Sequence, residues 1–192
     1  MAIRKIAVFG AGTMGNGIAQ TFAQHGFPVT MIDVKQEFVD RGMKAIDGSL
    51  DRLVKKEKID KAEKKEILGR IAASTTLSDA AGADLVVEAI FEDFDTKVSV
   101  FGELDAVCKP DTIFASNTSS ISITSIAART SRPKKFIGMH FMNPVPVMKL
   151  VEVIRGLATD DATTETVMTL SEKLGKTPIE VNDYPGFVSN RV

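Results

Sequence analysis

The sequence predicts an α/β fold with a doubly wound, mostly parallel sheet and one helical hairpin inserted into it. Three observations predict this class. A glycine-rich turn separates a short apolar run from a helical stretch, a second apolar run ends on Asp33, and further apolar runs alternate with helical stretches. Parallel strands need long crossovers, which are usually helices, so this alternation indicates a sheet covered on both faces.

The first two strands and the helix between them form the opening unit. Residues 3–9 are a short apolar run, and residues 14–24 carry apolar side chains at helical spacing. Gly26 is expected to end this helix as a left-handed cap, and residues 29–33 form the second buried strand.

The remaining segments continue the alternation. Residues 35–58 predict a long amphipathic helix, and residues 61–69 a second helix that folds back on it. Further strands are expected at residues 72–75, 84–90, 112–116, 136–141, 149–154 and 177–181. Helices are expected at residues 93–107, 122–129 and 162–174. No linker or repeat interrupts the pattern, so we expect one domain at residues 1–186.

Length and composition favour one soluble globular domain. A chain of 192 residues with 44% hydrophobic and 26% charged residues can bury a single core. Its 24 Lys and Arg nearly cancel its 25 Asp and Glu, so nucleic acid and anionic membranes are not expected as partners. No segment reaches the about 20 apolar residues of a membrane span. The lone Cys108, in a predicted helix, indicates a reducing compartment, and we expect the cytoplasm.

The glycine-rich turn has the pattern GxGxxG, with its glycines at Gly10, Gly12 and Gly15. Thr13 and Met14 lie between the second and the third glycine. Between a strand and a helix, the first glycine permits a tight turn, the second lets a pyrophosphate approach the backbone, and the third packs helix on strand. The N-terminus of the helix then faces the phosphates. We expect a dinucleotide on a Rossmann-type fold; the alternative is a glycine turn without a ligand.

Asp33 indicates which dinucleotide binds. It ends the second strand, about 20 residues beyond the glycines, where a carboxylate can accept hydrogen bonds from the adenosine ribose. This favours NAD over NADP, although the neighbouring Lys35 leaves room for some tolerance of NADP. We expect NAD as the cofactor and no metal.

The chain has two histidines that could act as the base in hydride transfer from an alcohol. His25 ends the first helix, where a donor or cation suits the helix dipole, so we expect a structural role. His140 ends a predicted strand, and ligands of open α/β sheets bind outside such ends. His140 is therefore the better candidate, with a satisfied core histidine as the alternative.

Glu152 favours the catalytic interpretation of His140. If residues 136–141 and 149–154 turn back antiparallel about residue 146, positions 140 and 152 oppose each other directly. A carboxylate on one imidazole nitrogen would fix the tautomer and stabilise the imidazolium that forms. The two prolines of the intervening NPVP segment could shift the register by one residue and reverse the faces, which leaves the pair open at this point.

Five segments together form a family signature: GAGTMGNGIAQ, DLVVEAIFED, FASNTSSISITSIA, GMHFMNPVPVMKLVEVI and DYPGFVSNRV. They closely resemble the 3-hydroxyacyl-CoA dehydrogenases, in particular the bacterial short-chain 3-hydroxybutyryl-CoA type. The resemblance covers essentially the whole chain, and its most specific part is HFxNPV followed by a Glu.

The resemblance implies catalytic roles for four residues. His140 is the general base and Glu152 its partner, as the spacing also favours. Ser119 binds the reacting oxygen, and Asn190 completes the polar site. Without the resemblance, Ser119 would be interpreted as a helix cap and Asn190 as a surface residue.

The resemblance also implies ligand contacts. Glu92, Lys97 and Asn143 match contacts to the nicotinamide half of the cofactor, and the alternative for the first two is a solvated helix start. Ser119 is also expected to contact the cofactor. Ser49 and Lys56 match contacts to the CoA moiety, and Ser119 is a further contact to the substrate, through its reacting oxygen.

Lys55, Lys56 and Lys58 offer cationic partners for CoA phosphates, although such a run is also typical of a solvated face.

Family members continue into an all-helical domain that supplies a homodimer interface, and residues 187–192 are expected to begin it. The expected reaction is NAD-dependent oxidation of (S)-3-hydroxyacyl-CoA to 3-oxoacyl-CoA and its reverse. Two alternatives stay open: a non-catalytic NAD-binding protein, and a dehydrogenase of free 3-hydroxyacids.

Overall fold

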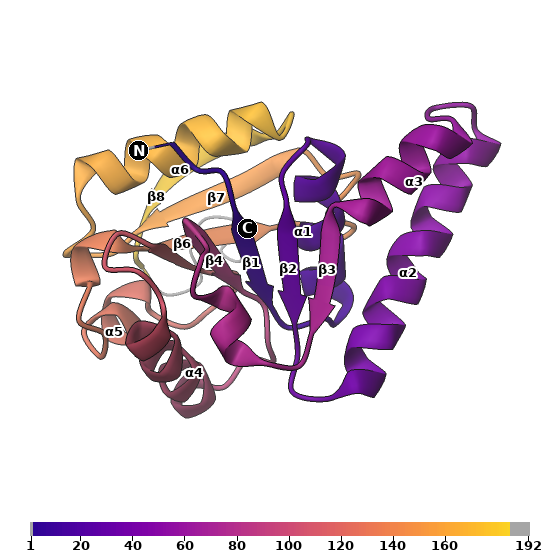
Figure 1. Cartoon of the computed structure of the whole chain (residues 1–192). Helices are drawn as coiled ribbons and strands as arrows, with labels where there is room; N and C mark the ends of the chain where they lie inside the picture. Colours follow the sequence, from indigo (N-terminus) through magenta and orange to yellow (C-terminus); the bar gives the residue numbers. More distant parts are fainter. Residues whose placement is uncertain (1, 185–192) are drawn as a thin grey trace.

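The structure is a computed structural model that describes residues 2–184. It contains an eight-stranded sheet in the order β3-β2-β1-β4-β5-β6-β7-β8 (Figure 1). All neighbours are parallel except β6 and β7. The strands are β1 Ile6–Phe9, β2 Val29–Ile32, β3 Ile71–Ser74, β4 Leu85–Glu88, β5 Ile113–Ser116, β6 Phe136–Phe141, β7 Leu150–Arg155 and β8 Thr177–Asn182. The predicted doubly wound, mostly parallel sheet is therefore confirmed.

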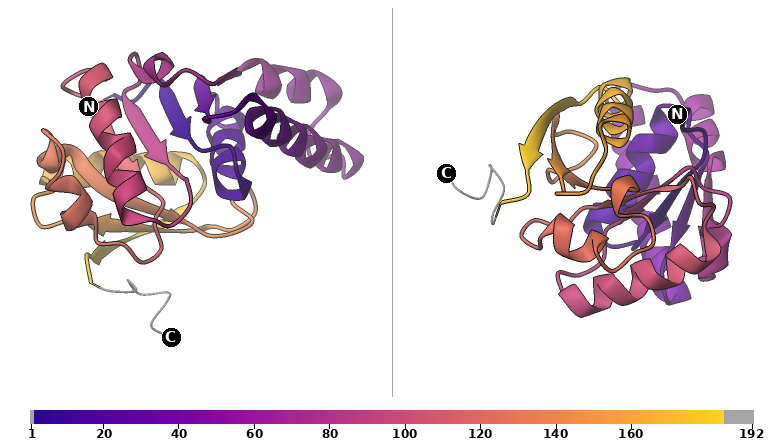
Figure 2. Two further views of the ribbon diagram at one scale, coloured as in Figure 1. Left: turned by 90° about the horizontal axis from the view of Figure 1, so that it is seen from below. Right: turned by 90° about the vertical axis from the view of Figure 1, so that its left-hand side faces the viewer.

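Helices cover both faces of the sheet. The α-helices are α1 Thr13–Gln24, α2 Gln36–Lys55, α3 Lys61–Gly69, α4 Phe94–Val107, α5 Ile123–Ala127 and α6 Asp161–Lys173, with short 3-10 helices at Leu77–Ala80 and Pro133–Lys135. Alternate residues of β1 point to opposite cores: Ile6 and Val8 pack with α1, α2 and α6, whereas Ala7 and Phe9 pack with α4 and α5. Both turned views show these two helical layers (Figure 2).

The helical hairpin of α2 and α3 packs beside β3 at one end of the sheet and extends beyond it (Figure 1). Helix α2 is amphipathic: Val39, Ile46 and Leu50 on its apolar face are fully buried against the core, and its charged residues lie on the opposite face. Helix α2 ends at Lys55 rather than at residue 58, since Glu57 adopts a positive φ of 53°.

Several predicted boundaries move by a few residues. The strand expected at residues 84–90 ends at Glu88, because the chain then turns through a loop that leads into α4. Cys108 was expected to lie in a helix, but this prediction is wrong. It directly follows α4 as a buried capping residue with extended backbone. Burial raises the pKa of its thiol to about 11. Gly26 has the expected left-handed φ of 85°.

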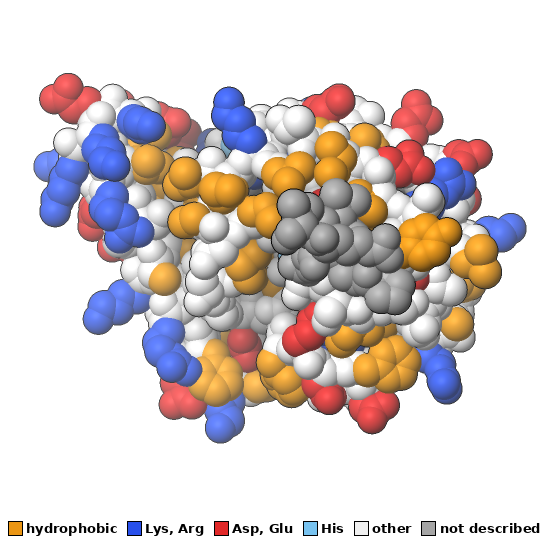
Figure 3. Space-filling model, turned by 180° about the vertical axis from the view of Figure 1, so that it is seen from behind, with side chains coloured by type: hydrophobic (Ala, Val, Ile, Leu, Met, Phe, Trp, Pro, Cys, Tyr) orange, Lys and Arg blue, Asp and Glu red, His pale blue; other side chains and the backbone are white. Residues whose placement is uncertain are grey.

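Apolar side chains are also found on the surface. The large ones that are exposed in the described part of the chain are Val34, Phe91, Val147, Met148, Leu157 and Tyr184. From behind, apolar side chains gather in the middle of the face and charged ones lie toward its rim (Figure 3). None of the helices between residues 2 and 184 is long and apolar enough to cross a membrane.

Candidate active site

The glycine turn between β1 and α1 has a different steric requirement at each glycine. Gly10 has a φ of 108°, and a Cβ there would lie 2.6 Å from the carbonyl oxygen of Ala89. A Cβ on Gly15 would lie 1.8 Å from the carbonyl oxygen of Gly10, so the helix packs directly on the turn. A Cβ on Gly12 would meet nothing within 4 Å, which leaves this backbone accessible to a ligand at the N-terminus of α1.

Asp33 directly follows β2 and faces this turn. One carboxylate oxygen accepts a hydrogen bond from the backbone N–H of Ala11 at 2.7 Å, and the other accepts one from Val34 at 2.7 Å. These bonds fix the carboxylate beside the glycine turn. Asp33 also lines a hollow of about 390 Å³ with residues from the turn, α1 and α2.

The hollow also contains a cation–ring contact that the sequence did not indicate. Phe38 and Arg41 of α2 line it, and the Arg41 guanidinium lies 4.8 Å from the centre of the Phe38 ring. The cation of Lys35 lies 5.6 Å from the same ring. The spacing of one helical turn between residues 38 and 41 was the available signal, but an exposed helix face gives no reason to single it out.

The carboxyl end of β4 carries a buried charge cluster. Lys97 of α4 is 1% exposed, and its ammonium group lies 2.5 Å from a carboxylate oxygen of Glu88, which is fully buried. It also lies 3.4 Å from Glu92. Glu88 accepts further hydrogen bonds from Ser116 at 2.6 Å and from the N–H of Ile90 at 2.7 Å. The alternative of a solvated helix start is therefore wrong for Lys97.

Glu92 connects this cluster to the loop after β5. One of its oxygens accepts hydrogen bonds from the hydroxyl of Thr118 at 2.5 Å and from the N–H groups of Ser119 and Ser120 at 2.9 and 3.0 Å. Partial burial opposes ionisation, but the hydrogen bond from Thr118 and the charge of Lys97 outweigh it, so the pKa of Glu92 is lowered.

Ser119 therefore lies in a loop that is tied to the end of β4. The interpretation of Ser119 as a helix cap is wrong, because Ser122 caps α5 by accepting a hydrogen bond from the N–H of Ser125. The position of Ser119 near both β4 and β5 agrees with a role in the site, which stays a prediction.

His140 and Glu152 form a buried pair. They are direct partners in the antiparallel register of β6 and β7, which confirms the predicted spacing. Nδ1 of His140 lies 2.6 Å from a Glu152 oxygen; a carboxylate can only accept, so the imidazole donates here. His140 is 9% exposed and Glu152 is fully buried. This geometry fixes the tautomer of the neutral imidazole in which the proton is on Nδ1.

The other predicted residues lie in several parts of the chain. Asn143 is exposed in the β6–β7 connection. Ser49 is half-buried in α2, and Lys56 is exposed at the end of that helix. Asn190 lies outside the described residues. Exposed His25 donates from Nδ1 to the carbonyl oxygen of Thr21 at 2.8 Å, which agrees with the expected structural role.

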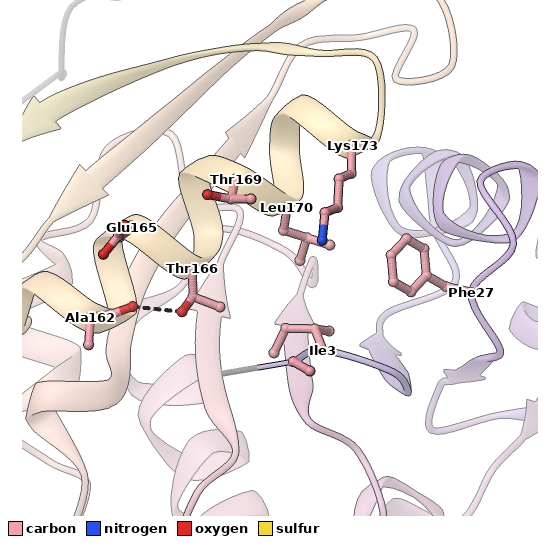
Figure 4. Close-up of a pocket in the computed structure, with 9 residues that line it drawn as sticks. Ile3, Phe27, Ala162, Glu165, Thr166, Thr169, Leu170 and Lys173 are labelled. Carbon is pink, nitrogen blue, oxygen red and sulfur yellow. Dashed lines mark hydrogen bonds between the residues drawn. The ribbon is translucent and has the colours of Figure 1, made fainter.

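A separate hollow of about 390 Å³ lies beside the amino ends of β1 and β2 (Figure 4). Ile3, Phe27 and Leu170 line it together with polar residues of α6 such as Lys173. It contains none of the predicted site residues. The glycine turn follows the carboxyl end of β1, and His140 lies near the carboxyl end of β6. This hollow therefore lies at the opposite ends of the strands and is not part of the candidate site.

A glycine turn with an oriented carboxylate and a buried histidine–glutamate pair, both at the carboxyl ends of strands in a doubly wound sheet, are typical of dinucleotide-dependent dehydrogenases. The chain belongs to one family of this class, described as "3-hydroxyacyl-CoA dehydrogenase, NAD binding domain", whose profile matches residues 5–184. NAD is therefore the cofactor of this domain, as the sequence predicts.

Named relatives agree with this membership. The chain is 57% identical to a probable 3-hydroxybutyryl-CoA dehydrogenase of Bacillus subtilis over all of its length and 67% of that protein. It is 48% identical to the fatty acid oxidation complex subunit alpha of Idiomarina loihiensis, of which it covers 26%. The crystal structure of (S)-3-hydroxybutyryl-CoA dehydrogenase from Ralstonia eutropha matches with a TM-score of 0.98 and 52% identity, over 100% of this chain and 68% of that one.

Proposed function

We propose that this chain carries the NAD site and the proton-transfer pair of an (S)-3-hydroxyacyl-CoA dehydrogenase. The reaction converts (S)-3-hydroxyacyl-CoA and NAD⁺ to 3-oxoacyl-CoA, NADH and a proton, and it runs in either direction. One observation carries the proposal: the buried His140–Glu152 pair, joined at 2.6 Å, lies at the same sheet edge as the glycine turn. A domain that only bound NAD would not need such a pair.

The residues around β1 and β2 fit the cofactor. The open backbone at Gly12 and the N-terminus of α1 suit a pyrophosphate, and the oriented carboxylate of Asp33 suits the ribose hydroxyls. Bound NAD⁺ supplies the hydride acceptor. Glu92, in the loop after β4, and Lys97, of α4, are proposed to face the nicotinamide half.

The chemistry at the other end belongs to His140. Its Nδ1–H donates to Glu152, so Nε2 accepts the hydroxyl proton as the hydride leaves the substrate carbon. Glu152 then stabilises the imidazolium that forms. Ser119 and Asn190 are proposed, on the family resemblance, to bind the reacting oxygen. The chain's own contribution is to hold these groups in one geometry before the substrate arrives.

The proposed substrate is a short-chain CoA thioester. Relatives at 50% identity or more bear the name 3-hydroxybutyryl-CoA dehydrogenase, including that of Clostridioides difficile. Ser49 and Lys56 on the projecting hairpin are proposed contacts to the CoA moiety. An exposed ammonium such as that of Lys56 pairs well with phosphate.

A direct test uses the chain at a concentration above that of NADH and follows the loss of NADH absorbance after acetoacetyl-CoA is added. We expect one slow turnover, no comparable turnover with free acetoacetate, and NADH binding that does not depend on either substrate. Turnover with acetoacetate at the same rate would favour a dehydrogenase of free 3-hydroxyacids. NADH binding without any oxidation in either case would favour a non-catalytic role.

A further inference from the structure

Strand β6 continues beyond the end of its neighbour β5. The parallel backbone pairing of β5 and β6 stops where Ser116 opposes Gly138. Strand β6 runs on to Phe141, and its last residues pair with β7 on the other side. The part of β6 that carries His140 is thus supported by backbone pairing on one side, beyond the point at which β5 has ended.

Beyond the end of β5, the side chain of Asn117 supplies the hydrogen-bond acceptor for β6. Its carbonyl oxygen Oδ1 accepts a hydrogen bond from the backbone N–H of Phe141 at 2.9 Å. Phe141 directly follows His140 and is 2% exposed, so this N–H would be costly to leave without a partner. Asn117 therefore continues the ladder between β5 and β6 with a side chain.

Asn117 and its two neighbours are hydrogen-bonded to the end of β4 and to the loop that follows it. Its own backbone N–H donates to the carbonyl oxygen of Glu88 at 2.8 Å, at the carboxyl end of β4. On either side of it, Ser116 donates to the Glu88 carboxylate and Thr118 donates to Glu92. A displacement of Asn117 would have to break several bonds at once, so its oxygen is a fixed reference point for β6.

We propose that Asn117 is a positioning residue for His140, a role that rests on the proposed function. It fixes the backbone immediately after the base, and the 2.6 Å bond to Glu152 fixes the ring from the opposite strand. Together they hold the imidazole in one place and in one tautomer. Misplacement of a reacting group by about 1 Å can cost a factor of about 100 in rate, so support of this kind matters for turnover.

The chain offers matched variants for a test. Asn117→Ala removes the acceptor, whereas Asn117→Asp keeps an oxygen at the same position. Thr159→Val is the control for a general loss of stability, because the Thr159 hydroxyl donates to the carbonyl oxygen of Phe136, at the other end of β6, at 2.6 Å. Both Asn117→Ala and Thr159→Val remove one side-chain bond to the backbone of the same strand.

The readout is the pair of imidazole ¹⁵N shifts of His140, with His25 as an internal control in the same spectrum. In the unchanged chain, Thr159→Val and Asn117→Asp, we expect well-separated shifts for a protonated Nδ1 and an unprotonated Nε2. In Asn117→Ala the two shifts should move toward each other as tautomers exchange, while His25 stays unchanged. Single turnover of acetoacetyl-CoA at saturating NADH should fall by about 10-fold or more in Asn117→Ala alone.

Identical His140 shifts and rates in Asn117→Ala and Thr159→Val would overturn the positioning role. If Asn117→Ala does not fold, Asn117→Gln, which moves the same amide by one methylene, is measured in its place, with the same expected and contrary results. NADH affinity distinguishes the two proposals: it should be unchanged in all four variants. A chain that does not bind NADH at all contradicts the proposed function, whereas unaltered His140 shifts contradict only the role of Asn117.

Discussion

The two ends of the candidate site differ in the kind of groups that form them and in how deeply these groups are buried. Around β1 and β2 the site consists of backbone groups, glycines and the partly exposed carboxylate of Asp33, beside an open hollow. Around β4 to β7 it consists of buried charged side chains, of which Glu88, Lys97 and Glu152 are at most 1% exposed.

This difference corresponds to two tasks. A cofactor is bound by groups at the surface, where the ligand replaces water. Proton transfer needs groups whose orientation is fixed before the substrate arrives and whose charges act away from water. The β1–β2 end is suited to affinity, and the β4–β7 end to rate.

The largest effect is expected for the base at the β4–β7 end. His140→Gln should lower single turnover of acetoacetyl-CoA by roughly 100-fold or more, because general acid–base catalysis supplies about 10²–10⁴. NADH affinity, measured by fluorescence, should stay the same. Near-normal turnover would remove His140 from the mechanism.

A smaller effect, on affinity, is expected at the β1–β2 end. Asp33→Ala should weaken NADH binding by about 1.5–3 kcal/mol, because the ribose hydroxyls lose a charged acceptor. Asp33→Asn is the matched variant, since it keeps an oxygen for the N–H of Ala11 and removes only the charge. Unchanged affinity in both variants would show that the carboxylate does not contact the ribose.

A smaller effect, on stability, is expected at the N-terminus of α5. Ser122→Ala removes the side-chain cap of α5 and a hydrogen bond to Asp183, and it should lower the free energy of unfolding by about 1 kcal/mol. NADH affinity should not change, because Ser122 lies away from the glycine turn. Chemical denaturation measures the first quantity, and an unchanged midpoint would show that the cap contributes nothing to stability.

The smallest effect is a dependence on pH. The folded pKa of Glu92 lies below its ordinary value of 4.5, so its stabilising contribution is fully present above about pH 4.5. It is lost as the pH falls through the lowered pKa. Because Glu92 is partly exposed, we expect about 1 kcal/mol or less. Amide exchange at Ser119 and Ser120 should quicken at acid pH in the unchanged chain and be less pH-dependent in Glu92→Gln; equal pH dependence would contradict this assignment.

Much of the fold follows from local patterns in the sequence. The glycine turn, the strand ending before Asp33 and the alternation of strands and helices all depend on neighbouring residues, and each was predicted. The opposition of His140 and Glu152 was also predictable, because strand length and one short connection determine the register.

The sequence did not indicate that Glu88 and Lys97 are buried, or which side chains connect neighbouring strands. Glu88 ends an apolar strand and lies between β1 and β5, so its partners are distant in sequence. Lys97 belongs to a helix start that looks solvated, and only the position of Glu88 explains its burial. Asn117 supports β6 only because β5 ends before it does, which the spacing of residues does not reveal. These contacts depend on which strands become neighbours.

The division between binding and chemistry is tested most directly by measuring two quantities for Asp33→Ala and His140→Gln side by side. These are the NADH dissociation constant and the rate of a single turnover of acetoacetyl-CoA at saturating NADH. We predict that Asp33→Ala raises the dissociation constant by about 10-fold or more and leaves the saturated rate nearly unchanged. His140→Gln should leave the dissociation constant nearly unchanged and lower the rate by roughly 100-fold or more. If each variant altered both quantities to the same extent, the two ends would not have separate tasks and the account would be wrong.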